Sequence, residues 1–137
     1  ENEIMMLKSK HNQVTVDTVE PVVTAPEIIE AQKTVENIYV AEPIFEYIAK
    51  LAEASRKHPQ IKLGLSPRGT IALLKMIKAT ALLKGRDYVL PDDVIYTFSD
   101  VVSHRIMLNS KARINGVDEE KVLQEIIASV SVPKIRR

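Results

Sequence analysis

One apolar segment, Ser66–Gly85, constrains the fold more than any other part of this chain. It predicts a helix from Pro67 to Lys84, because proline suits a first helical position and glycine suits a helix end. Apolar residues occupy most of its circumference, and Lys75 and Lys78 form the one obvious polar stripe. A helix that apolar is normally surrounded by other helices, so we place it at the centre of a bundle.

The rest of the chain also reads as helical. Aromatic residues make up 4% of it and glycine occurs four times, and strand-like alternation is scarce. The predicted fold class is therefore all-α: a small bundle of about five helices, with a short β-hairpin between the last two. Besides a helix end in residues 1–11, the other predicted helices are Thr24 to about Asn37, about Ala41 to Lys57, one starting at Pro91, and one capped by Asp118 that ends before Pro133.

Connections and core residues follow from the same patterns. Val14–Val23 is expected to be an extended linker, and Arg105–Val117 is expected to contain the strand pair. Residues at helical spacing define the buried faces of the predicted helices. The candidate core residues are Ile44, Tyr47, Ile48, Leu51, Ile71, Leu73, Leu74, Met76, Ile77, Ala81, Leu83, Val94, Phe98, Val101, Val102, Val122, Leu123, Ile126, Ile127 and Val130.

Composition excludes several classes of protein. The 137 residues can form one domain with a core, and 19 basic against 18 acidic residues argue against a dedicated nucleic-acid binder. Without cysteine, neither a disulfide framework nor a thiolate metal site can form. No apolar run approaches the roughly 20 residues of a membrane span, and the N-terminus lacks the features of a signal peptide. We expect a cytoplasmic protein and, since the chain opens without methionine, a part of a longer one.

The start of the apolar helix carries the candidate chemistry. Ser66 can cap the helix, and Pro67 loses nothing at the first position, where amides are free. Arg68 then lies at the positive end of the helix dipole, where a cation is disfavoured by roughly 0.3–1 kcal/mol. The same amides can bind phosphate, and a guanidinium matches phosphate oxygens. Two interpretations of Arg68 stay open. Local physics favours a side chain that is solvated or paired with a surface carboxylate, and the alternative is a side chain that binds phosphate.

A phosphate-binding loop is excluded at this position. Gly64, Gly69 and Thr70 imitate its glycine spacing, but threonine stands where the loop requires lysine. The pair Asp92–Asp93 follows no hydrophobic strand, and helix capping and the dipole explain it better than Mg²⁺ binding does.

Other candidate sites are weaker. His11, His58 and His104 lack the spacing of a metal site, so we expect none, and no serine or threonine has a histidine placed to activate it. A cluster of basic residues is better explained as a solvated helix end than as a binding site for a polyanion. Its members are Arg56, Lys57, His58, Lys62 and Arg68.

An ordered set of motifs resembles the C-terminal region of MoxR-type AAA+ ATPases. The resemblance extends over about residues 20–133 and is carried by the combination rather than by any single motif. Its motifs are Glu20–Glu27, Leu63–Gly69, Ile71–Leu74, Leu82–Val89, Pro91–Val94, His104–Ile106 and Val130–Pro133.

The resemblance implies a lid domain and a role for its first-turn arginine. In that family this arginine is sensor 2, which reaches the γ-phosphate of ATP, so Arg68 takes the catalytic role, with Ser66 and Pro67 beside it on the phosphate side. Implied boundaries are the end of the core and a connector in 1–24, the lid in 25–133 and a tail in 134–137. The family more often has Thr or Ser where Leu90 stands, so the helix after it is expected to lack its usual cap.

The resemblance also implies a larger machine. The full protein would use ATP and Mg²⁺, form a ring, expected to be hexameric, and act as a chaperone-like remodeller with von Willebrand factor A-domain partners. The Walker elements would lie upstream, so this chain alone is expected to be inactive and to need no cofactor. The alternatives are a stand-alone helical protein-interaction module and, less favoured by the charge balance, a nucleic-acid-binding domain.

Overall fold

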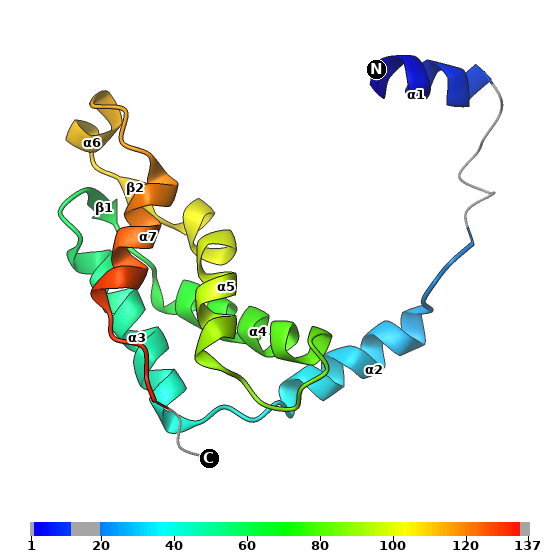
Figure 1. Ribbon diagram of the computed structural model, residues 1–137, viewed down its shortest axis with the longest axis horizontal. Coiled ribbons are helices and arrows are strands. Elements are labelled where there is room, and N and C mark those ends of the chain that lie inside the picture. Colours follow the sequence, from blue (N-terminus) through cyan, green and yellow to red (C-terminus); the bar gives the residue numbers. More distant parts are fainter. Residues whose placement is uncertain (1, 12–19, 135–137) are drawn as a thin grey trace. The chain divides into compact units, whose positions relative to one another are not determined.

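The computed structural model describes residues 2–11 and 20–134, the side chains of residues 9–11 excepted. It divides into two units, residues 1–31 and 32–137, with the boundary inside α2. The predicted start of the lid at residue 25 lies earlier and stays a prediction. In chain order (Figure 1) the elements of the described part are α1 Asn2–His11, α2 Ala25–Glu36, α3 Glu42–Lys57, β1 Ile61–Leu63, α4 Pro67–Leu83, α5 Pro91–Val102, the 3₁₀ helix η2 Ser103–Arg105, β2 Met107–Leu108, α6 Ser110–Ile114 and α7 Glu119–Ser129.

The predicted helices all form, and the fold is mostly helical as expected. At the start of α2 the predicted capping box is present: the Thr24 amide donates to Glu27 Oε2 at 2.7 Å, and the Glu27 amide donates to Thr24 Oγ1 at 3.4 Å. These bonds hold the pKa of Glu27 below its usual value. Most of the predicted linker, residues 12–19, lies outside the described residues, and residues 20–23 form no strand. Of the predicted tail, only Lys134 is described.

The core of the second unit lies between α3, α4, α5 and α7. Helix α4 packs mainly against α5, while α7 packs against both α3 and α5 (Figure 1). The buried faces of α3, α5 and α7 are those that the sequence predicted. The largest fully buried side chains are Tyr47, Phe98, Ile44, Leu51, Leu65, Leu73, Ile77, Leu123, Ile126, Val94, Val102 and Val122.

Tyr47 carries a polar atom into this core. Its side chain is 1% exposed, and its hydroxyl has no hydrogen-bond partner among the described residues. Burial raises the pKa of this phenol. A buried donor without a partner costs free energy, so the ring and not the hydroxyl accounts for the contribution of Tyr47 to the core.

The substitution Tyr47→Phe is therefore expected to leave the free energy of unfolding unchanged or to raise it by up to about 1 kcal/mol. Tyr47→Ala, which empties the space of the ring, is the contrasting variant and should cost about 3–5 kcal/mol. Urea unfolding of the chain measures both values. A loss above about 1 kcal/mol in Tyr47→Phe would show that the hydroxyl has a stabilising partner.

The strand pair differs from the predicted local hairpin. β2 lies in the expected segment, but its antiparallel partner is β1, with Ile61 opposite Leu108 and Leu63 opposite Met107. The rest of the segment forms the short helix α6, which Asn109 caps by accepting from the Ala112 amide at 2.9 Å. This pairing could not be predicted, because the partner strand is three residues long and lies more than 40 residues earlier.

Helix α4 ends as its glycine predicted. Gly85 has φ +72°, a left-handed conformation that glycine adopts at little cost. The chain then runs beside residues 38–40: the Tyr39 amide donates to the Asp87 carbonyl at 2.8 Å, and the Val89 amide donates to the Tyr39 carbonyl at 3.0 Å. These two bonds attach the segment after α2 to the connection between α4 and α5.

Candidate functional site

The first turn of α4 is built as the sequence predicted. Ser66 is extended (φ −73°, ψ 160°), and its Oγ accepts a hydrogen bond from the Gly69 amide at 3.1 Å. The Ser66 carbonyl accepts from the Thr70 amide at 2.9 Å. Pro67 has no amide hydrogen to offer. Of the three residues predicted on the phosphate side, Ser66 is thus engaged as the helix cap, and Arg68 is the one whose side-chain donors have no acceptor among the described residues.

Arg68 is exposed and unpaired. The structure gives its guanidinium no hydrogen bond and no ion pair among the described residues. The reading in which Arg68 pairs with a surface carboxylate therefore has no support within the described part of the chain. The positive charge of Arg68 adds to the positive potential of the helix N-terminus, and no carboxylate among the described residues compensates it. The arrangement suits an incoming anion.

The glycines on either side of Leu65 serve packing. Leu65 is fully buried, and a Cβ on Gly69 would come within 2.5 Å of Leu65 Cδ1. A Cβ on Gly64 would come within 2.6 Å of the Arg56 Cα. The segment is therefore packed against α3 and does not form the cradle of free amides that a phosphate-binding loop needs, as its missing lysine indicated.

The face of α4 that carries Arg68 is open, which corrects the prediction of a helix surrounded by others. The buried strip of α4 consists of Gly69, Leu73, Ile77 and Ala81, one residue in four. Outside it, exposed fractions reach 58% for Ile71, 50% for Met76 and 87% for Leu83. Helix α4 has apolar residues on two sides, and the described residues bury only one of these sides. Large exposed apolar residues around a cation are typical of a surface that another protein body covers.

The predicted basic cluster does not assemble into a patch of free cations. Arg56 Nη1 donates to the Leu65 carbonyl at 2.8 Å, and Lys57 Nζ lies 2.6 Å from Glu53 Oε1. His58 Nε2 lies 3.4 Å from Glu125 Oε2 on α7. Among the described residues no group of three or more His, Cys, Asp or Glu side chains could hold a metal ion. Every helix in the described part is too short or too polar to cross a bilayer.

Two features of the surroundings were missed by sequence reasoning. Ser55 is fully buried, and its Oγ accepts from the Leu65 amide at 2.9 Å while donating to the Ala52 carbonyl at 2.7 Å. A signal was present, because Ser55 falls on the apolar face of α3 four residues after Leu51. A polar residue on a buried face needs a partner inside the protein.

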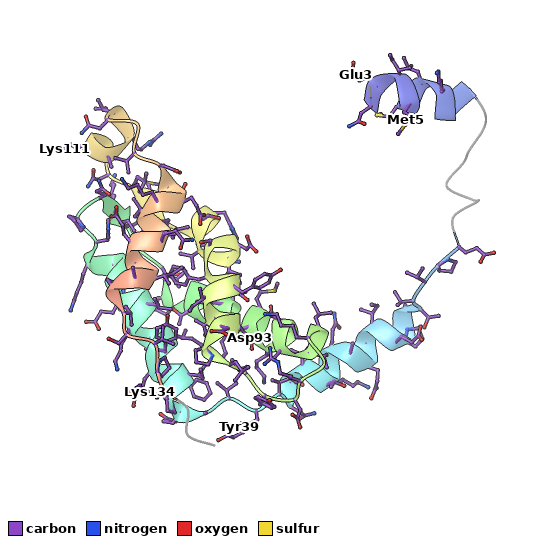
Figure 2. All side chains as sticks on the ribbon, in the orientation of Figure 1. Glu3, Met5, Tyr39, Asp93, Lys111 and Lys134 are labelled. Atoms are coloured by element: carbon purple, nitrogen blue, oxygen red, sulfur yellow. The ribbon has the colours of Figure 1, made fainter. Side chains whose placement is uncertain are left out.

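The second feature that sequence reasoning missed is the ion-pair cluster around Asp93 at the start of α5 (Asp93 is labelled in Figure 2). The Asp93 side chain is 1% exposed and accepts from Arg86 at 2.6 and 2.8 Å and from Lys84 Nζ at 3.1 Å. It also accepts from the Leu90 amide at 2.9 Å, which is the half of a capping box that needs no acceptor on the Leu90 side chain; the side-chain cap itself is absent, as expected. Burial alone would raise the pKa of Asp93, but these hydrogen bonds outweigh it and hold the pKa below its ordinary value.

Comparison with known proteins agrees with this geometry. The family model of the AAA lid domain matches residues 53–126, more than half of the chain. YeaC of Bacillus subtilis (strain 168), an uncharacterized protein, is 39% identical over 133 residues, which are 97% of this chain and 41% of that protein. Chaperone MoxR1 of Mycobacterium tuberculosis is 27% identical over 131 residues, which are 89% of this chain and 35% of that protein.

A solved structure gives the same result in three dimensions. The crystal structure of a candidate ATPase from Cytophaga hutchinsonii, at 2.00 Å resolution, superposes with a TM-score of 0.83 at 26% identity. The match covers 96% of this chain and 43% of that one. The chain thus spans about two fifths of the length of the relatives it matches. It belongs to the AAA lid domain family, and its relatives are of the MoxR type, as its motifs predicted.

Proposed function

We propose that this domain is the lid of a MoxR-like ATPase, that it closes over ATP bound by a separate nucleotide-binding core, and that Arg68 contacts the γ-phosphate. The observation that carries the proposal is the exposed Arg68 at the N-terminus of α4, which has no partner in the described part of the chain and lies on a helix with large exposed apolar residues. Such a surface fits a second body of the same protein, and the relatives are more than twice as long as this chain.

The lid residues would supply binding and electrostatics rather than the whole reaction. Arg68 would stabilise negative charge that develops on the transferred phosphoryl group. Mg²⁺ would accompany the ATP bound by the nucleotide-binding core, and no residue of this chain is proposed as its ligand. Closure of the lid on ATP and its release after hydrolysis would drive chaperone-like remodelling in a ring, expected to be hexameric, with von Willebrand factor A-domain partners.

A comparison of nucleotide affinities tests the contact. In the chain joined to its nucleotide-binding core, Arg68→Ala is expected to weaken a slowly hydrolysed ATP analogue about 10- to 100-fold, since a hydrogen bond to a charged group contributes about 1.5–3 kcal/mol. ADP, which lacks the γ-phosphate, should change by less than about twofold. Calorimetric titration measures both, and Lys75→Ala, an exposed cation seven residues along the same face, is the control.

Two results would contradict the proposal. Equal weakening of both nucleotides would place Arg68 away from the γ-phosphate. Unchanged affinity for both would favour the helical protein-interaction module, which the open apolar face of α4 also fits. The chain without a core should bind ATP at millimolar concentration or not at all, because Arg68 is the single phosphate contact proposed for it, and micromolar affinity would overturn the assignment as a lid.

A further inference from the structure

The connection between β1 and α4 is attached to α3 through both backbone polar groups of Leu65. The Leu65 amide donates to Ser55 Oγ at 2.9 Å, and the Leu65 carbonyl accepts from Arg56 Nη1 at 2.8 Å. Ser55 and Arg56 are consecutive residues in the last turn of α3, which ends at Lys57. Ser55 is itself fixed, because its hydroxyl also donates to the Ala52 carbonyl. One residue is therefore held at both ends by one helix turn.

Close packing makes this attachment stiff. Gly64 passes so near the α3 backbone that a Cβ there would lie 2.6 Å from both the amide nitrogen and the Cα of Arg56. The buried Leu65 side chain lies under the first turn of α4, where a Cβ on Gly69 would lie 2.5 Å from its Cδ1. Neither glycine has the positive φ that would otherwise explain it, so close approach is the reason for both. The first turn of α4 cannot shift along α3 without breaking these contacts.

We infer that Ser55 and Arg56 are positioning residues for Arg68, which lies three residues after Leu65, the residue that they hold. The inference rests on the proposed contact of Arg68 with ATP. Arg68 has no partner of its own in the described part of the chain, so its location depends on the backbone that carries it. A misplacement of about 1 Å at a group that acts on a transition state can cost about 100-fold in rate. The α3 turn thus sets where the guanidinium lies when the lid closes.

Steady-state ATP hydrolysis by the chain joined to its core tests this inference. Arg56→Met keeps an unbranched apolar stem but loses the hydrogen bond to Leu65, and it should lower kcat about tenfold with KM for ATP changed by less than about threefold, because the loss falls on the transition state. Arg56→Lys keeps a donor and should recover activity to within about threefold of wild type. Lys57→Met, which removes only an exposed ion pair with Glu53, is the matched control and should leave kcat unchanged.

The same substitution in an Arg68→Ala background separates positioning from general damage. If Arg56 acts through Arg68, Arg56→Met should have no further effect once Arg68 is gone. An equal loss in both backgrounds, or no loss from Arg56→Met where Arg68→Ala is impaired, would overturn the positioning role and leave the proposed function standing. Unchanged hydrolysis in Arg68→Ala alone would overturn both.

Hydrogen exchange on this chain provides a test that does not depend on hydrolysis. Ser55→Ala removes the acceptor of the Leu65 amide and should raise its exchange rate at least about tenfold relative to the amides of the neighbouring α4 core. Ser129→Ala is the control, since its hydroxyl makes a similar bond, to the Ile126 carbonyl at 2.7 Å, at the end of α7. Unchanged exchange at Leu65 would show that Ser55 does not hold this segment.

Discussion

Asp93→Asn is expected to lower the free energy of unfolding by about 3–5 kcal/mol, as much as removing a large side chain from the apolar core. Asparagine matches the shape of aspartate but lacks its charge, so Arg86 and Lys84 would lose their shared partner. The Arg86 side chain is 19% exposed and has little access to water with which to replace that partner. Urea unfolding should show the loss, and thermal unfolding should fall by roughly 10–20 °C.

The neighbouring carboxylate is the matched control for this prediction. Asp92 lies in the same first turn of α5 but is exposed, so Asp92→Asn should cost no more than about 1 kcal/mol, the usual size of a helix-dipole effect. Replacing the buried pair together, as Arg86→Met with Asp93→Leu, should recover part of the stability, because the poorly hydrated guanidinium goes with its partner and the remaining cation, Lys84, is 42% exposed and reaches water. Equal losses in Asp92→Asn and Asp93→Asn would show that the cluster adds nothing beyond the dipole.

The ion-pair cluster around Asp93 also predicts how the stability of the fold changes as the pH is lowered. Asp93 has a pKa below its ordinary value of 3.8 in the folded chain. Its contribution is therefore complete above pH 3.8 and is lost as the pH falls through the folded pKa. The stability difference between wild type and Asp93→Asn should be constant near neutral pH and shrink below about pH 3.8. A difference that grows with acidity would contradict a lowered pKa.

Arg68→Ala is expected to reduce ATP turnover about 100-fold in the chain joined to its core, the usual cost of removing one donor that stabilises charge in a transition state. At saturating ATP the loss should appear in kcat, in addition to the weaker binding of ATP, because the charge redistributed during phosphoryl transfer is present only in the transition state. Lys75→Ala should leave kcat within about twofold. Turnover measured at saturating ATP checks both values, and an unchanged kcat in Arg68→Ala would contradict the proposed contact.

Stability provides the complementary measurement for Arg68. The Arg68 side chain has no partner in the described residues and lies at the positive end of α4, so Arg68→Ala should unfold no more easily than wild type and should gain up to about 1 kcal/mol. Loss of turnover together with unchanged or higher stability would identify a residue retained for function. A loss of stability of more than about 1 kcal/mol would indicate a structural role instead.

Local features of the fold could be predicted because their physical causes are local. Ser66 with Pro67 defined the start of α4, Thr24 with Glu27 defined the start of α2, and Gly85 defined an end. The buried faces of α3, α5 and α7 followed from periodicity. Each of these features depends on groups within about four residues of one another, which is the reach of a helical turn.

Features that join distant segments could not be predicted. β1 is too short to be recognised without β2, and neither the Ser55–Leu65 bond nor the Lys84 contact with Asp93 has a spacing that sequence rules describe. The centrality of α4 was overestimated for a related reason. Apolarity shows that a helix surface avoids water, but it does not show whether the covering atoms belong to the same part of the chain.

The longer helices, the caps at Thr24, Ser66 and Asp118, the family and the choice of Arg68 as the candidate contact could all be predicted from the sequence alone, because propensity, capping and motif order are properties of neighbouring residues. Only the packing of the helices shows that Arg56 and Asp93 are engaged, while Arg68 has no partner in the part of the chain that the structure describes. The same packing decides which side of α4 is open. These are questions of which groups meet across the core, and only the packing of α3, α4 and α5 answers them.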